Sequence, residues 1–225
     1  MIAHAPFEMA RGPPTFTRAM ADVGQVAWLP RVATAMAREM PEARLPVVGI
    51  EAMVSLGDLP SSEVDLHIGV AAEGPGIHAE AIFVERTVLV SRKGHPACTR
   101  RLSRQRLGQF QHVGVEMVPG RGARDPVAAA YARARTERIV AMTVPTFATP
   151  AAVAAATDLV ATLPTSLLAA PEIRQELRAV HGPVPDHAVT VSWCRHERTH
   201  ADPAMAHFRA LVRREPLAAT EVQRP

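Results

Sequence analysis

"LPSSEVDLHIGV", residues 59–70, predicts a strand that ends at a glycine. Every second residue from Val64 to Val70 is apolar, which is the two-residue period of a β-strand. Gly69 weakens such a strand unless another group has to approach the backbone there. Two interpretations follow: an edge strand with one satisfied carboxylate at Asp65, or a strand whose end lies at a binding site.

The stretch belongs to a repeating order of strands and helices. Upstream lie a strand at 15–20, a helix at 22–41, a strand at 45–50 and a short helix or turn at 53–59. Such alternation is typical of a parallel sheet with crossover helices. Two long β-runs, at 81–97 and 187–196, interrupt this order, which restarts between them and includes a helix predicted at 166–177.

We therefore predict an α/β fold of two Rossmann-like lobes with a central cleft, joined by two crossing strands. Lobe I is expected to comprise residues 14–85 plus 188–215, and lobe II residues 88–185. Residues 1–13 and 216–225 are expected to be tails.

Composition indicates an ordinary globular protein. The 225 residues are 48% hydrophobic and 21% charged, with a formal net charge of +3. This charge does not mark a nucleic-acid binder. Two cysteines cannot form a disulfide framework, the N-terminus has no signal-peptide pattern, and no apolar run approaches the roughly 20 residues of a membrane span. We expect a soluble, cytoplasmic protein.

The sequence offers little for catalysis. It has no G-x-S-x-G elbow, Walker loop or dinucleotide fingerprint, and we expect no metal-ligand set among its ten histidines. Ser62 and Ser166 lack a base at a recognisable spacing. We expect no enzymatic activity, no cofactor and no metal site.

Ligands of open parallel sheets bind beyond the carboxyl ends of the strands. Those ends fall at 21–25, 67–70, 116–125, 144–150 and 163–166, and the amides of helix N-termini that follow them favour anions. Simpler interpretations stay open, because Asp22 and Thr149 are good helix caps and Trp28 suits a core. Arg121 and Arg124 suit solvated loop positions.

Several motifs, in this order and spacing, resemble the effector-binding region of LysR-type transcriptional regulators from about Thr15 to Val212. The similarity is strongest to the subgroup that senses salicylate and nitroaromatic compounds. The motifs are FTRAMADVGQVAWLPRV, EVDLHIGV, ERTVLVSRKGHP, HVGV, VPTF, TDLVATLP and DPAMAHFRALV.

The resemblance implies a type 2 periplasmic-binding-protein-like fold with a small-molecule inducer in the cleft, an aromatic carboxylate being expected, and a homodimer or tetramer. Such regulators carry an N-terminal helix-turn-helix and a linker helix, and residues 4–17 resemble the end of that linker. DNA contact is therefore expected only through a helix-turn-helix domain that this chain lacks, and no membrane contact is expected. The alternative is a stand-alone cytoplasmic solute-binding protein of the same fold.

The resemblance also implies the effector contacts. They are Asp22, Val23, Gly24, Trp28, Gly69, Arg86, Arg121, Arg124, Thr146, Phe147 and Ser166. Relatives are expected to have arginine where Ser166 stands, so Arg86 is predicted to be the main anion partner, assisted by the amides at Val23 and Gly24. Alternatively, Arg86 pairs with Glu85 or Asp65.

Overall fold

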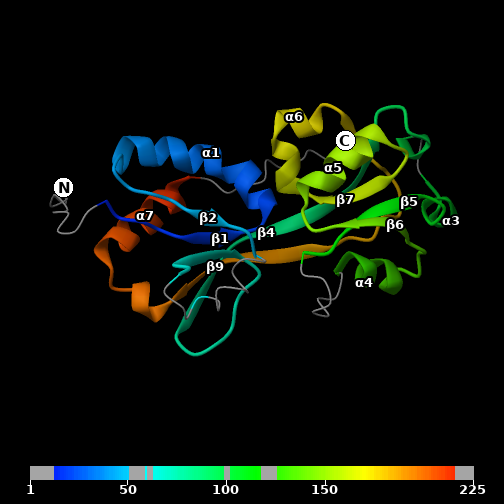
Figure 1. Ribbon diagram of the computed structural model, residues 1–225. Helices are drawn as coiled ribbons and strands as arrows, with labels where there is room; N and C mark the ends of the chain where they lie inside the picture. Colours follow the sequence, from blue (N-terminus) through cyan, green and yellow to red (C-terminus); the bar gives the residue numbers. More distant parts are fainter. Residues whose placement is uncertain (1–12, 51–58, 60–62, 99–101, 118–125, 216–225) are drawn as a thin grey trace. The chain divides into compact units, whose positions relative to one another are not determined.

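The structure, a computed structural model, describes residues 13–50, 59, 63–98, 102–117 and 126–215. The helix or turn predicted before Leu59, the loop arginines Arg121 and Arg124, and both predicted tails, except Pro13 of the first, lie outside these residues. Figure 1 shows the described elements and labels most of the helices and strands.

The chain divides into two compact units. Within the described ranges, unit 1 holds residues 13–20, 28–81 and 192–215, and unit 2 holds residues 21–27 and 82–191. The chain passes from one unit to the other inside strands β4 (Ile77–Arg92) and β9 (Ala188–His196). Both strands coincide with the long β-runs seen in the sequence.

Unit 1 has a sheet in the order β2-β1-β3-β9. Strands β1 (Arg18–Met20), β2 (Val47–Val48) and β3 (Leu66–Gly69) are parallel, and β9 is antiparallel to β3. Its helices are α1 (Asp22–Glu39), whose first turns belong to unit 2, and α7 (Pro203–Arg214). The Asp202 side chain caps α7 by accepting the Ala204 and Met205 amides at 2.8 and 3.0 Å. A short 3-10 helix, η3 (Glu197–Thr199), precedes it.

The opening stretch is an interior strand, so its interpretation as a sheet edge is wrong. β3 pairs with β1 on one side and β9 on the other. The Asp65 carboxylate is satisfied, because it accepts hydrogen bonds from the Thr17 amide at 2.9 Å and the Arg198 guanidinium at 3.2 Å. A Cβ at Gly69 would lie 2.7 Å from the His67 ring, so the glycine makes room for a neighbouring side chain.

Unit 2 is an open sheet in the order β4-β7-β5-β6, with β8 (Leu177–Ala179) also paired to β4. Strands β5 (Gln111–Val115), β6 (Ile139–Val144) and β7 (Val160–Pro164) are parallel, and β4 is antiparallel to β7. Its α-helices are α3 (Arg104–Leu107), α4 (Pro126–Arg133), α5 (Ala148–Ala156) and α6 (Pro171–Arg174); its 3-10 helices are η1 (Pro96–Cys98) and η2 (Thr165–Ala169).

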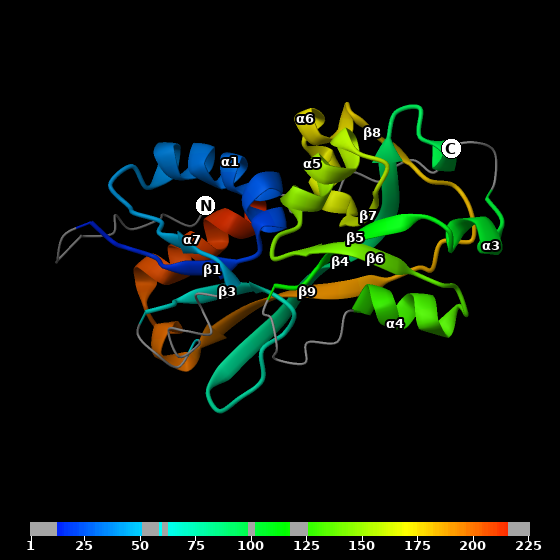
Figure 2. The same cartoon turned by 45° about the vertical axis from the view of Figure 1, so that its right-hand side comes forward.

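Helices cover both faces of this sheet, as Figure 2 shows for α5 and α4. Side chains of β7 alternate between two cores: Ala161 and Leu163 pack with the α5 side, and Val160 packs with Tyr131 of α4. This is the doubly wound arrangement that the strand–helix order predicts.

The single helix predicted at 166–177 is wrong. That stretch forms η2, then α6, and then begins β8. Ala170 is extended, with φ −72° and ψ 115°, because the ring of the following proline disfavours helical backbone at the residue before it.

Among the described residues, no helix is both long and apolar enough to cross a membrane.

A buried base in unit 2 makes the fold sensitive to acid. His112 on β5 is 0% exposed and contacts the Tyr131 ring edge-on at 5.4 Å. Neither of its ring nitrogens has a hydrogen-bond partner within the described part of the chain. Burial, and then the positive charge of Arg138, lower the pKa of His112 from 6.5 to about 4. Between pH 6.5 and about pH 4, His112 is protonated in the unfolded chain but neutral in the folded chain. The free energy of unfolding therefore falls as the pH falls through this range.

We therefore expect His112→Leu to remove part of the acid sensitivity. Between pH 7 and pH 4.5 the parent should lose about 2 kcal/mol more unfolding free energy than the variant. Urea unfolding at the two pH values measures this difference. Identical pH dependence in the two proteins would contradict the assignment.

Candidate functional site

Most of the predicted effector contacts lie in unit 2. Asp22, Val23 and Gly24 form the first turn of α1, Thr146 and Phe147 lead into α5, Ser166 is in η2, and Arg86 is on β4. Trp28 and Gly69 belong to unit 1. In the structure, Asp22 is hydrogen-bonded to Phe147, and Ser166 is hydrogen-bonded to Glu85, the residue before Arg86.

The Asp22 carboxylate caps α5, not its own helix. Its two oxygens accept the amides of Phe147 at 2.9 Å and Ala148 at 2.7 Å. A negative charge at a helix N-terminus satisfies free amides and interacts favourably with the helix dipole. Thr149, the other cap candidate, bonds through its hydroxyl to that of Thr146 at 2.7 Å. The anion position at the start of α5 is thus held by a carboxylate of the chain itself.

A second internal carboxylate, Glu85, holds the start of η2. It is 9% exposed and accepts the Thr165 hydroxyl at 2.8 Å, the Ser166 amide at 3.2 Å and the Ser166 hydroxyl. Glu85 was not among the contact residues predicted from the sequence. Its signal was an acidic residue inside the apolar run AIFVERTVLV. Ser166 stands where an arginine is expected in relatives. It is buried and donates hydrogen bonds to the Glu85 carboxylate.

Arg86 pairs with Asp186, at 2.9 Å between nitrogen and oxygen. The alternatives considered from the sequence are both wrong, because Glu85 bonds to η2 and Asp65 pairs with Arg198. The two side chains are 54% and 61% exposed, so this pair contributes little and leaves the guanidinium accessible. Asp186 carried no recognisable signal in the sequence.

Trp28 and Gly69 have local structural roles in unit 1. Trp28 is 2% exposed and meets Trp193 edge-on at 6.3 Å, which is the core position that was the simpler interpretation. Gly69 accommodates the His67 ring. An effector contact at either residue stays a prediction.

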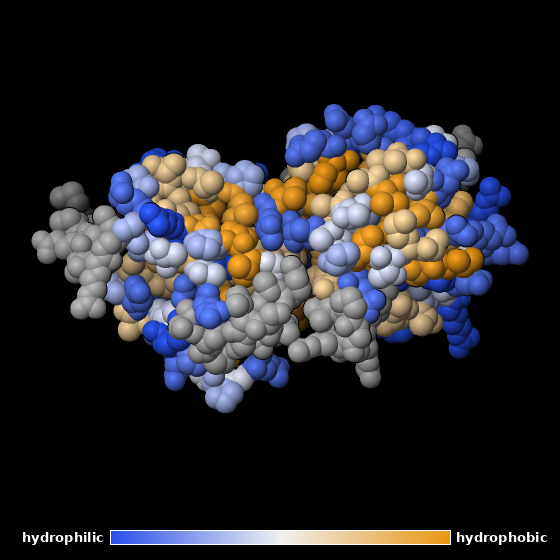
Figure 3. Space-filling view, in the orientation of Figure 1, coloured by the Kyte–Doolittle hydropathy of each residue, from blue (hydrophilic) through white to orange (hydrophobic). Residues whose placement is uncertain are grey.

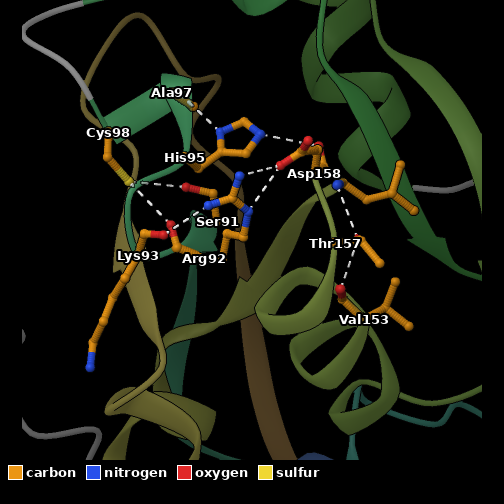
Figure 4. Close-up of polar contacts among 10 residues, drawn as sticks. Ser91, Arg92, Lys93, His95, Ala97, Cys98, Val153, Thr157 and Asp158 are labelled. Atoms are coloured by element: carbon orange, nitrogen blue, oxygen red, sulfur yellow. Dashed lines mark hydrogen bonds and ion pairs between the residues drawn. The ribbon is translucent and has the colours of Figure 1, made fainter.

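The motif ERTVLVSRKGHP ends in a turn that side-chain hydrogen bonds hold (Figure 4). Arg92 bonds to Asp158 through Nε at 2.9 Å and through a terminal nitrogen at 2.6 Å. His95 Nδ1 accepts the Ala97 amide at 2.9 Å, so Nε2 donates to the Asp158 carbonyl at 3.1 Å. Gly94, with φ +71°, provides the left-handed residue of the turn.

The side chains gathered in unit 2 are polar, aromatic and charged. Among the residues that the structure describes, no group of three His, Cys, Asp or Glu side chains could hold a metal ion. What the site residues supply is two satisfied carboxylates, hydroxyls, the partly buried Phe147 and one accessible arginine.

Comparison with known proteins yields a consistent result. The profile of the LysR substrate binding domain matches residues 19–216. The chain is 29% identical over 210 residues to the HTH-type transcriptional activator NagR of a Ralstonia species, covering 92% of this chain and 67% of NagR. It is 28% identical over 212 residues to the HTH-type transcriptional activator NahR of Pseudomonas putida, covering 93% and 69%.

A solved structure shares the fold. The probable transcriptional regulator PA0477 of Pseudomonas aeruginosa matches with a TM-score of 0.79 at 23% identity, covering 95% of this chain and 70% of that one. The predicted fold class, a two-lobed type 2 periplasmic-binding-protein-like fold, is confirmed.

Proposed function

Because this chain belongs to the LysR substrate-binding domain family, we propose that it senses a small aromatic acid and thereby controls transcription in the cytoplasm. The family match over residues 19–216 is the observation that carries the proposal. A sensory role needs a ligand that binds one conformation better than another, and no chemical step. DNA contact would come from a helix-turn-helix domain.

In unit 2, carboxylates of the chain itself already occupy backbone amides that could otherwise bind an anionic ligand. Asp22 accepts the amides at the start of α5, and Glu85 accepts the Ser166 amide and hydroxyl. An inducer carboxylate therefore needs a side-chain partner. Arg86 is the accessible cation among the described contact candidates, and its planar fork suits a carboxylate.

Asp186 is the internal competitor for this arginine. An incoming carboxylate has to replace the Arg86–Asp186 pair, whose exposed geometry makes it worth about 1 kcal/mol or less. Asp186→Asn removes the competing charge and is proposed to tighten binding of the acid.

The arginine can be tested against a matched control. We expect Arg86→Ala to weaken benzoate or salicylate at least about tenfold, since loss of one partner of a charge pair costs about 2–5 kcal/mol. Arg92→Ala, which removes an arginine from the same strand and frees Asp158, should leave affinity unchanged. Thermal-shift titration measures both, because a ligand of the native state raises the melting temperature.

The results distinguish an error in the role of Arg86 from an error in the ligand class. If Arg86→Ala and the parent bind aromatic acids equally, Arg86 is not the anion partner. If the parent binds no aromatic acid in the panel, the ligand class is wrong.

We also propose a homodimer in which α1 of one chain lies against unit 2 of another. The second half of α1 and β2 line an apolar hollow of about 350 Å³, with Leu29, Met36 and Val47 among its residues. In unit 2, β6 is the last strand in its sheet order, and apolar residues lie over it in Figure 3. An exposed apolar edge strand is a pairing surface unless it is covered.

A lysine on β6 should therefore give a monomer. Ile139, Val140 and Met142 are 40%, 43% and 45% exposed. We expect Met142→Lys to dissociate the dimer at tens of micromolar, roughly the range for an interface of ordinary size. Val84→Lys, at a 55% exposed position of β4, should not. Sedimentation equilibrium distinguishes the two variants, and a parent protein that is monomeric would refute the dimer.

A further inference from the structure

Unit 1 contains a charged side chain enclosed by aromatic rings. Arg18 on β1 is 0% exposed. The centre of its guanidinium lies 4.5 Å from the Trp28 ring of α1, 4.9 Å from the Phe208 ring of α7 and 5.9 Å from the Trp193 ring of β9. All four residues belong to unit 1.

The rings satisfy the faces of the guanidinium but not its edge. Among the residues that the structure describes, Arg18 Nε and both terminal nitrogens have no hydrogen-bond partner, and neither does the indole Nε1 of Trp28. Arginine and tryptophan side chains only donate hydrogen bonds. The cluster therefore gathers several buried donors with no acceptor, which is a rare and costly arrangement.

Loss of the proton does not relieve this cost near neutral pH. Burial lowers the pKa of Arg18 from 12.5 to about 9, and the surrounding rings of Trp28, Trp193 and Phe208 carry no titratable group. The residue is therefore still mainly charged at pH 7. Cation–π contact with the rings offsets part of the desolvation but supplies no acceptor.

We propose that Arg18 and the Trp28 indole form a carboxylate-binding site inside unit 1, separate from Arg86. The unpartnered nitrogens lie in the plane of the guanidinium, which is the geometry that receives two carboxylate oxygens. The site is fully buried, so a carboxylate enters through local opening of the cover that α1 and α7 provide. A short aliphatic acid and the carboxylate of an aromatic acid share this chemistry.

Thermal unfolding at constant ionic strength tests the site. The parent, Arg18→Met and Arg86→Ala are compared in sodium chloride, sulfate, formate and benzoate. We expect the melting temperature of the parent and of Arg86→Ala to rise with formate, relative to chloride and sulfate, and Arg18→Met to show no such rise. If formate and benzoate both raise the melting temperature through Arg18, the site accepts short aliphatic and aromatic acids alike. If only benzoate does so, the site is one for the carboxylate of an aromatic acid.

Arg18→Met also controls for folding. Methionine fills the same core without a buried charge, so the variant should melt about 2–4 °C or more above the parent in chloride. An equal formate and benzoate response in the parent and in Arg18→Met overturns the site. A chloride response that equals the formate response and depends on Arg18 overturns the carboxylate assignment. A variant that melts below the parent in every salt shows that Arg18 is satisfied and overturns the proposal.

Discussion

The bond from the Asp22 carboxylate to the start of α5 organises unit 2. Its two oxygens accept the Phe147 and Ala148 amides, so the first turn of α1 is bound to the helix that follows β6. Val23 and Val26 then pack against the core beneath α5. This contact explains why residues 21–27 group with unit 2 although the remainder of α1 groups with unit 1.

The same contact constrains the chemistry of recognition. Helix N-termini in open α/β sheets are ready-made anion sites, but a carboxylate of the chain uses the amides at the start of α5, and Glu85 does so at η2. Under the proposed function, selectivity for an acid therefore depends on side-chain charge. Arg86 is exposed and weakly paired in unit 2, whereas Arg18 is buried and unpaired in unit 1. The two arginines therefore differ in how accessible they are to a ligand.

The strand–helix order could be predicted from the sequence because it depends on local features, namely the spacing of apolar residues and the prolines and glycines at which elements end. The apolar alternation predicted β3, and Pro171 could have warned that residues 166–177 do not form one helix. The partners of the charged residues were not readable. Asp22 finds α5 about 125 residues away, and Arg86 finds Asp186 100 residues away, and no spacing rule encodes such pairs. Arg18 did carry a signal, because it alternates with the apolar residues Phe16 and Met20 in a predicted strand, where a charge is unusual.

The central claim is that this chain binds a small aromatic acid through its charge. Isothermal titration calorimetry of the parent with salicylate and with its neutral amide, salicylamide, tests it most directly, because the two ligands share a ring and a hydroxyl. We predict saturable binding of salicylate that is about tenfold or more tighter than that of salicylamide. Equal affinity, or tighter binding of the amide, would contradict it.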